Sequence, residues 1–359
     1  MRGLGSVWLS VSILLWLTGC GTGSDRRGGI LEQTDVFVAG QDGIFEYRIP
    51  GLVTSNKGTL IAFCDARVKK RGDPPNNIDL VMKRSTDGGK TWSPLKTLVD
   101  VGEGAAADSC GLVDRQTGTI WIFSVYCPEG VGSSNAAVGL SGATFNYKGI
   151  KSDDDGETWS EPIDITPMVK KPEWSAGSTG VGKGIQMRSG RLILPRYYAD
   201  YHRPGQTPGD EAAYAASFVN YSDDHGQTWK IGDEVPTGGK TNECQVAELS
   251  DGSLVINMRG TIGNRRKIAR TTSSSRFTVA FDTPSASFAA VIRSIAARLM
   301  TSRDLPPRWR SSHRRCILSV SIVALWLCSL SHRTTASFHV RRGRSPSLEI
   351  RHSSAFVRS

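Results

Sequence analysis

Three copies of one eight-residue pattern constrain the fold of this chain more than any other feature. The pattern S-x-D-x-G-x-T-W occurs at Ser85–Trp92, Ser152–Trp159 and Ser222–Trp229, with starts 67 and 70 residues apart. A glycine followed by a short apolar run alternates with it, at Gly58, Gly118, Gly190 and Gly252. Turn glycines ahead of β-rich runs are typical of hairpins. Each period therefore has room for about four strands, which is the size of one propeller blade.

The octapeptide is typical of a turn. Its Asp and Ser side chains can bind nearby backbone groups, its Gly allows a positive φ, and its Trp can pack under the turn. The acid-rich copy, with Asp153–Asp155, also invites a calcium-loop interpretation, but it lacks the downstream glutamate of an EF-hand. We therefore predict structural turns and no metal site.

The composition favours an all-β chain whose charge is unevenly distributed. Gly 39 and Pro 16 indicate many short strands joined by turns. The net charge of +10 would suit a nucleic-acid partner, but residues 272–359 hold 14 Arg, no Lys and three acidic residues. The rest of the chain is close to neutral, so we expect no nucleic-acid partner for it.

The N-terminus has the pattern of an export signal. Arg2 precedes an apolar run from Val7 to Leu17, and Leu17-Thr18-Gly19-Cys20 follows. This ending resembles the lipobox of bacterial lipoproteins, which implies a signal peptide over residues 1–20, a lipid on Cys20 and a linker over 21–34. An ordinary secretory signal is the alternative. Either way we expect an exported protein, in the bacterial cell envelope or secreted. The six other cysteines form no metal or disulfide pattern.

Three Asp boxes behind the tetrapeptide Tyr47-Arg48-Ile49-Pro50 identify a family resemblance. Together they resemble the bacterial and animal exo-α-sialidases with Asp-box (BNR) repeats, which are six-bladed β-propellers. The resemblance covers about residues 35–271 and implies an all-β, incomplete sialidase-type propeller of about four blades. It also implies sialylated glycans as partners, retaining hydrolysis through a tyrosine nucleophile, and neither a metal nor an organic cofactor.

The first candidate site residues follow from the substrate's carboxylate. A planar anion requires fixed positive charge in a bidentate geometry, which arginine provides. By resemblance, Arg48 is the first of three arginines that hold this carboxylate. Arg67 matches an arginine that binds the sugar, and Asp73 matches the general acid/base, with Asp79 as a second candidate for the acid.

Further candidates lie downstream. Glu243, in the segment TNECQVAEL, resembles the glutamate that pairs with the tyrosine nucleophile, and Arg259 matches the second arginine of the three. Tyr197 and Tyr198 resemble substrate-pocket tyrosines. The structural alternatives are a plain strand pair with surface charges for Glu243 and Arg259, and rim packing for the tyrosines.

The chain departs from the family pattern near residue 272. It has no tyrosine after Tyr221, Ser273–Arg276 stands where a fourth Asp box would begin, and Gly343 is the one glycine beyond that point. We predict that residues 272–359 are an out-of-frame, unrelated tail. A disordered basic arm for nucleic acid or anionic surfaces is one alternative. A membrane anchor at Cys316–Leu330 is another, although 15 residues are fewer than the ~20 needed to span a bilayer.

The sequence therefore predicts an exo-α-sialidase impaired by the loss of its last blades. A non-catalytic propeller that binds sialosides or other glycans is the alternative. Sialoside binding without release of sugar would distinguish the second from the first.

Overall fold

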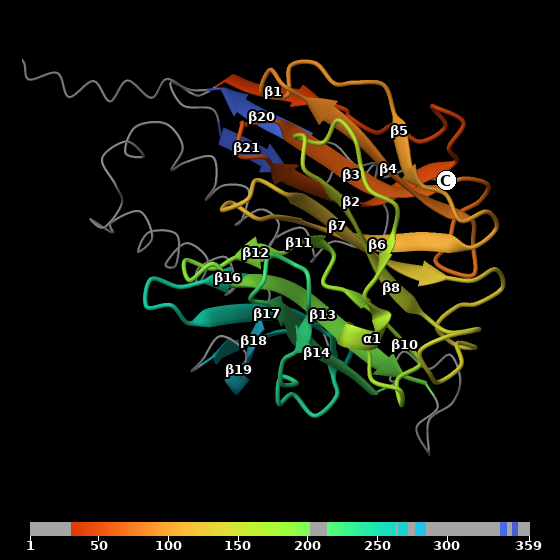
Figure 1. The fold of residues 1–359 in the computed structure, drawn as a ribbon, viewed down its shortest axis with the longest axis vertical. Helices are drawn as coiled ribbons and strands as arrows, with labels where there is room; N and C mark the ends of the chain where they lie inside the picture. The colour runs from red at the N-terminus through yellow and green to blue at the C-terminus, as the bar shows by residue number, and fades with distance from the viewer. Residues whose placement is uncertain are drawn as a thin grey trace, which may run out of the picture.

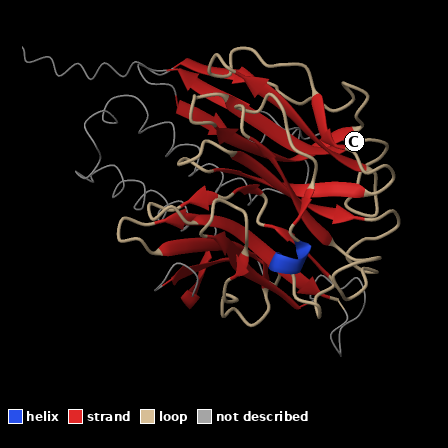
Figure 2. Ribbon diagram, in the orientation of Figure 1, coloured by secondary structure: helices blue, strands red, loops and turns tan. Residues whose placement is uncertain are grey.

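The computed structural model describes residues 30–201, 214–262, 265–271, 277–284, 338–342 and 347–350. These residues form strands, with a single helical turn, α1 (Thr166–Val169) (Figure 2). No helix in these ranges is both long and apolar enough to cross a bilayer. The expected signal peptide, Cys20 and the segment Cys316–Leu330 lie outside the described residues.

Four blades of mainly antiparallel strands follow one another along the chain, and one parallel pair, Ile78 with Ala105, joins the first two into a single sheet (Figure 1). The first has β2 (Glu46–Thr54), β3 (Leu60–Arg67), β4 (Ile78–Ser85) and β5 (Lys96–Val99). The second has β6 (Ala105–Val113), β7 (Ile120–Cys127), β8 (Asn146–Ser152) and β9 (Ile163–Asp164). The third has β10 (Ala176–Thr179), β12 (Ile185–Gln186), β13 (Leu192–Asp200), β14 (Tyr214–Ser222) and β15 (Lys230–Ile231), while β11 (Gly182–Lys183) lies between β10 and β12 in the chain. The fourth has β16 (Thr241–Glu248), β17 (Leu254–Gly260), β18 (Arg265–Thr271) and β19 (Phe277–Pro284).

The blades confirm the all-β propeller architecture predicted from the repeat period. Each turn glycine begins the hairpin between two strands, and each Asp box follows the third strand of its blade. In the third blade the first strand is split, because β10 and β12 both pair with β13 while β11 leaves to pair with β6 of the second blade.

The described strands do not close into a ring. No pair among them joins β16–β19 to β2–β5, which fits an incomplete propeller. The fourth sheet extends past residue 271, where the sequence placed the end of the propeller, because β19 pairs with β18. The expected tail also contributes β20 (Phe338–Arg342) and β21 (Ser347–Ile350), which form a separate sheet with β1 (Ile30–Thr34).

The hydrophobic core lies mainly between successive blades. Ile61 and Phe63 of the first blade share a cluster with Ile122 of the second. Other clusters join Phe123 to Leu194, between blades two and three, and further apolar residues of β13 and β14 to those of β16 and β17. Burial at these seams stabilises a blade only when its neighbour is present.

The Asp boxes form the predicted turns. In the second copy, the Ser152 hydroxyl accepts the Gly156 N–H at 2.8 Å and donates to Asp154 Oδ1 at 2.8 Å. Thr158 donates its N–H and its hydroxyl to the same carboxylate. The corresponding serine, aspartate and threonine in the other two copies make the same contacts. These residues therefore act as turn staples.

Candidate active site

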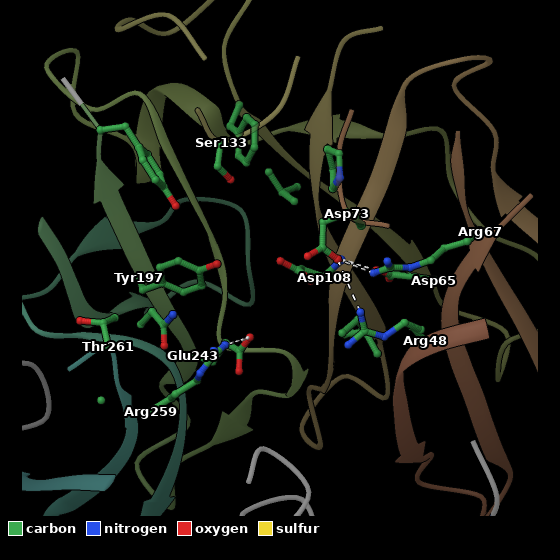
Figure 3. Close-up of a pocket in the computed structure, with 18 residues that line it drawn as sticks. Arg48, Asp65, Arg67, Asp73, Asp108, Ser133, Tyr197, Glu243, Arg259 and Thr261 are labelled. Carbon is green, nitrogen blue, oxygen red and sulfur yellow. Dashed lines mark hydrogen bonds and ion pairs between the residues drawn. The ribbon is translucent and has the colours of Figure 1, made fainter. Parts of the chain in front are cut away.

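One pocket of about 280 Å³ receives side chains from all four blades (Figure 3). It is lined by Arg48, Ile49, Asp65, Arg67, Asp73, Pro74, Ala107, Asp108, Val125, Ser133, Phe145, Tyr197, Tyr201, Asn242, Glu243, Arg259, Gly260 and Thr261. Six of the residues predicted from the sequence therefore meet in one place: Arg48, Arg67, Asp73, Tyr197, Glu243 and Arg259.

Irregularities in the first strand of each blade place part of the pocket lining. The ladder shifts register after Arg48 in β2, after Ala107 in β6 and after Thr241 in β16, and the first strand of the third blade is interrupted between β10 and β12. A bulge bends a strand locally and redirects a side chain. Of the residues within these shifts, Ile49, Asp108, Asn242 and Glu243 line the pocket.

Three arginines supply positive charge from two sides. Arg67 is 1% exposed, and its Nη2 lies 2.6 Å from Asp73 Oδ1. Arg48 Nη1 lies 3.7 Å from the same oxygen, and Arg259 Nη1 lies 3.2 Å from Glu243 Oε1. The Nε and Nη1 atoms of Arg67 are buried without a protein partner. Unpartnered buried donors are costly, so this guanidinium is suited to an oxygen from a ligand or water.

Two further carboxyl groups, Asp65 and Asp108, lie deeper than Asp73. Asp65 is fully buried, and burial followed by the charge of Asp108 raises its pKa well above the ordinary value. Burial raises the pKa of Asp108 to about 6, and the charges of Asp73 and Glu243 act in the same direction. The pocket thus combines arginines that are paired with carboxylates at its surface with two deeper carboxyl groups whose pKa values are raised.

Tyr197 and Tyr198 are placed differently from each other. Tyr197 lines the pocket, and burial raises its pKa well above the ordinary value, which keeps the phenol neutral. Tyr198 does not line it, which corrects the prediction: its ring stacks on Trp174 at 4.2 Å, and its hydroxyl donates to Glu234 Oε2 at 2.9 Å. Successive residues of a strand point to opposite faces, so two adjacent tyrosines of β13 cannot both enter the pocket.

Two other candidates lie elsewhere. Asp79, the second candidate for the acid, is buried on β4 and does not line the pocket. Cys20, the predicted lipidation site, lies outside the described residues.

Sequence reasoning missed Asp65, Asp108 and Tyr201 as pocket residues. A signal for the first two is present, since each is an aspartate inside a strand that is otherwise almost fully buried. A buried carboxyl group needs a compensating role, because burial without a partner is unfavourable.

The arrangement is suited to an anionic ligand. Two arginine side chains on opposite walls can hold a planar carboxylate, while the carboxyl groups accept hydrogen bonds from hydroxyl groups. Within the described ranges, no group of three or more His, Cys, Asp or Glu side chains is placed to hold a metal ion.

Comparisons with known proteins agree with this fold. The family described as the BNR repeat-like domain matches residues 58–297. A sialidase of Bacteroides fragilis (strain YCH46) is 36% identical over 246 residues, which cover 65% of this chain and 43% of the relative. A sialidase of Micromonospora viridifaciens is 35% identical over 253 residues, which cover 67% of this chain and 37% of the relative.

A solved structure shows the same relationship. The Hadza microbial sialidase Hz136 superposes with a TM-score of 0.62 at 35% identity, over 70% of this chain and 49% of that protein. The matched region thus spans half or less of the length of these three relatives. The chain belongs to the BNR repeat-like domain family and, within it, to the sialidases that carry Asp-box repeats.

Proposed function

We propose that the pocket recognises the terminal sialic acid of a glycan, and that the chain is a retaining exo-α-sialidase whose hydrolytic step is impaired. The observation that carries this is the convergence of Arg48, Arg67, Asp73, Glu243 and Arg259 on one pocket. Arg48, Arg67 and Asp73 come from the first blade and Glu243 and Arg259 from the fourth, so strand pairing within one blade does not explain why the two sets meet.

Each side chain has a role in this proposal. Arg48 and Arg259 hold the carboxylate on the anomeric carbon, and Arg67 donates hydrogen bonds to the sugar. Asp73 has a 76% exposed side chain at the pocket mouth, where a leaving group would depart. It gives its proton to the glycosidic oxygen as that bond breaks, and later takes a proton from the attacking water.

The nucleophile is the missing part of this scheme. In the mechanism that the family resemblance implies, Glu243 takes the proton of a tyrosine that attacks the anomeric carbon. The sequence has no tyrosine after Tyr221, and Glu243 Oε1 is paired with Arg259 instead. This favours the second candidate function, in which the pocket binds sialosides without turnover.

Release of 4-methylumbelliferone from its α-sialoside by the full chain tests the loss of turnover that both functions share. Both predict little or no release, together with sialoside binding seen by saturation-transfer NMR. Turnover that disappears in Asp73→Ala would show an intact sialidase and refute impairment. Absence of both binding and release would refute sialic acid recognition.

We also propose export with lipid attachment at Cys20, on the basis of the residue pattern over 1–20. In a bacterial host, the full chain should partition into the detergent phase of Triton X-114, and Cys20→Ser should move it to the aqueous phase. Equal partitioning of both chains would contradict lipid attachment.

A further inference from the structure

The backbone at Asp108 is strained and held in place. Asp108 lies in the β6 bulge between Ala107 and Cys110, and its φ is +53°. This left-handed conformation is uncommon for a residue other than glycine, and it persists only where the surroundings fix it. Two neighbouring blades provide that restraint.

Both polar groups of Asp108's backbone are bound by side chains of neighbouring blades. Its N–H donates to Oδ2 of Asp65 at 3.1 Å, from β3 of the first blade. Its carbonyl oxygen accepts the hydroxyl of Thr179, from β10 of the third blade. Asp65 is 0% exposed and Thr179 is 1% exposed, so water does not replace either contact. The bulge therefore depends on side chains that are 43 and 71 residues away in sequence.

We propose that Asp65 and Thr179 are positioning residues, which hold the Asp108 bulge so that the Asp108 carboxylate points into the pocket and accepts a hydrogen bond from the ligand. The identity of the ligand as a sialoside rests on the proposed function. Without these two contacts the bulge can be replaced by regular pairing of β6 with β7. A shift of one residue in a strand moves a side chain to the opposite face, so loss of the bulge would remove the carboxylate from the pocket.

The electrostatic surroundings of Asp108 come from several elements. Asp65 and Arg67 face it from β3, Asp73 from the loop after β3, Ser178 from β10 and Glu243 from β16. Asp65→Leu would remove the side-chain oxygen that accepts the Asp108 N–H as well as the charge, whereas Asp65→Asn would keep an acceptor oxygen without the charge. Comparing the two substitutions separates the acceptor from the charge.

Amide hydrogen exchange at Asp108, followed by NMR in the full chain, tests the restraint without a ligand. Asp65→Leu and Thr179→Val should both speed exchange of the Asp108 amide at least tenfold, while Asp65→Asn and Thr179→Ser should leave it within about threefold of wild type. Thr179→Val is the informative variant, because Thr179 does not contact that amide. Unchanged exchange in Thr179→Val would overturn the shared restraint.

Matched controls come from buried side chains at the Asp-box end of the same blades. Asp114, fully buried, directly follows β6, and Thr59 donates its hydroxyl to Asp155 of the second blade at 2.6 Å. Asp114→Leu and Thr59→Val should lower the melting temperature without speeding exchange at Asp108. If they speed it as much as Asp65→Leu and Thr179→Val do, the effect is general destabilisation and the proposal fails.

Binding of the methyl α-glycoside of N-acetylneuraminic acid, measured by calorimetry, tests the consequence for the pocket. Asp65→Leu and Thr179→Val should each weaken binding at least fivefold, with Asp65→Asn and Thr179→Ser within twofold of wild type. When either Asp65→Leu or Thr179→Val is combined with Asp108→Ala, it should weaken binding by less than a further twofold, because the carboxylate that it would position is already gone. Full additivity would overturn the proposal. If the wild-type protein binds no sialoside, the proposed function fails. Hydrogen exchange at the Asp108 amide then still tests whether Asp65 and Thr179 hold the bulge.

Discussion

Arg67 shows how a single residue prepares the pocket for an oxygen-rich ligand. Its guanidinium is 1% exposed, is paired with Asp73 on one nitrogen, and has two nitrogens without a protein partner. A ligand oxygen that accepts from these nitrogens removes an existing penalty, so the binding energy is preorganised in the free protein.

Arg67→Lys keeps the charge but loses the planar set of donors. We expect sialoside binding to weaken roughly tenfold or more, because an ammonium group cannot replace two donors in fixed geometry. Calorimetric titration measures this, with Arg188→Lys as the control, since Arg188 is 57% exposed and pairs with Glu248 away from the pocket. Equal affinity of Arg67→Lys and wild type would exclude this role.

Asp108 should make stability depend on pH in a definite direction. Burial raises its pKa from 3.8 to about 6, so between these values the folded protein holds a proton that the unfolded chain has released. The free energy of unfolding therefore falls as pH rises through this window. Asp108→Asn removes this contribution, so its stability relative to wild type should increase by on the order of 1 kcal/mol or more between pH 4 and 7. Urea unfolding at both pH values measures it, and a pH-independent difference would contradict the buried carboxyl group.

At the scale of elements, the two repeated motifs meet across the seam between blades. The Asp box of each later blade packs on the strand that follows the turn glycine of the preceding blade. A Cβ on Gly156 would lie 2.7 Å from Ile61 Cδ1, and one on Gly226 would lie 2.9 Å from Trp121. The residues next to these two glycines add polar contacts across the seam. Asp155 Oδ2 lies 2.9 Å from Arg84 Nη2, and His225 Nδ1 lies 2.6 Å from Asp114 Oδ2.

Gly156→Ala tests this seam, with Gly58→Ala as a matched control. Both glycines have a positive φ, +85° and +91°, but a Cβ at Gly58 meets nothing within 4 Å. Gly58→Ala should cost about 1–2 kcal/mol from backbone strain alone. Gly156→Ala should cost a further ~1–3 kcal/mol from overpacking against Ile61. Chemical denaturation gives both values, and equal losses would show that the blades do not pack through this glycine.

The blades and part of the pocket could be predicted from the sequence, whereas the bulge at Asp108 could not. The blades were predictable because the turn chemistry of the Asp boxes is local, and six pocket residues were predictable from motifs. Tyr198 was assigned wrongly although strand alternation already excluded it beside Tyr197. Asp108 stands out as an aspartate in an apolar strand, but its position in the pocket could not be predicted, because its bulge depends on Asp65 and Thr179, whose contacts form only when three blades assemble.

At the scale of the whole molecule, the open arrangement of blades is the main feature. A propeller closes when its last blade meets its first, and the described strands of blades one and four are not paired with each other. Unpaired strand edges and half-covered seams favour association between chains. We propose that the reading frame changes after about Thr272, where the arginine-rich composition begins.

Restoring the alternative reading frame after Thr272 should produce a more stable monomer. The added blades would cover the seam of blade four, so the melting temperature should rise and light scattering should show less aggregation. Release of 4-methylumbelliferone from its α-sialoside should appear at the same time. If the unaltered chain is already monomeric, and is as stable and as active as the chain with the restored frame, the frame change is contradicted.

The most direct test compares two ligands that differ in a single charge, the methyl α-glycoside of N-acetylneuraminic acid and its carboxyl methyl ester. Arg48 and Arg259 are proposed to hold that carboxylate, and esterification removes its charge without changing the sugar ring. Calorimetric titration of the full chain should give binding of the acid and at least tenfold weaker binding of the ester. Equal affinity for the two ligands, or no binding of either, would contradict recognition of sialic acid by this pocket.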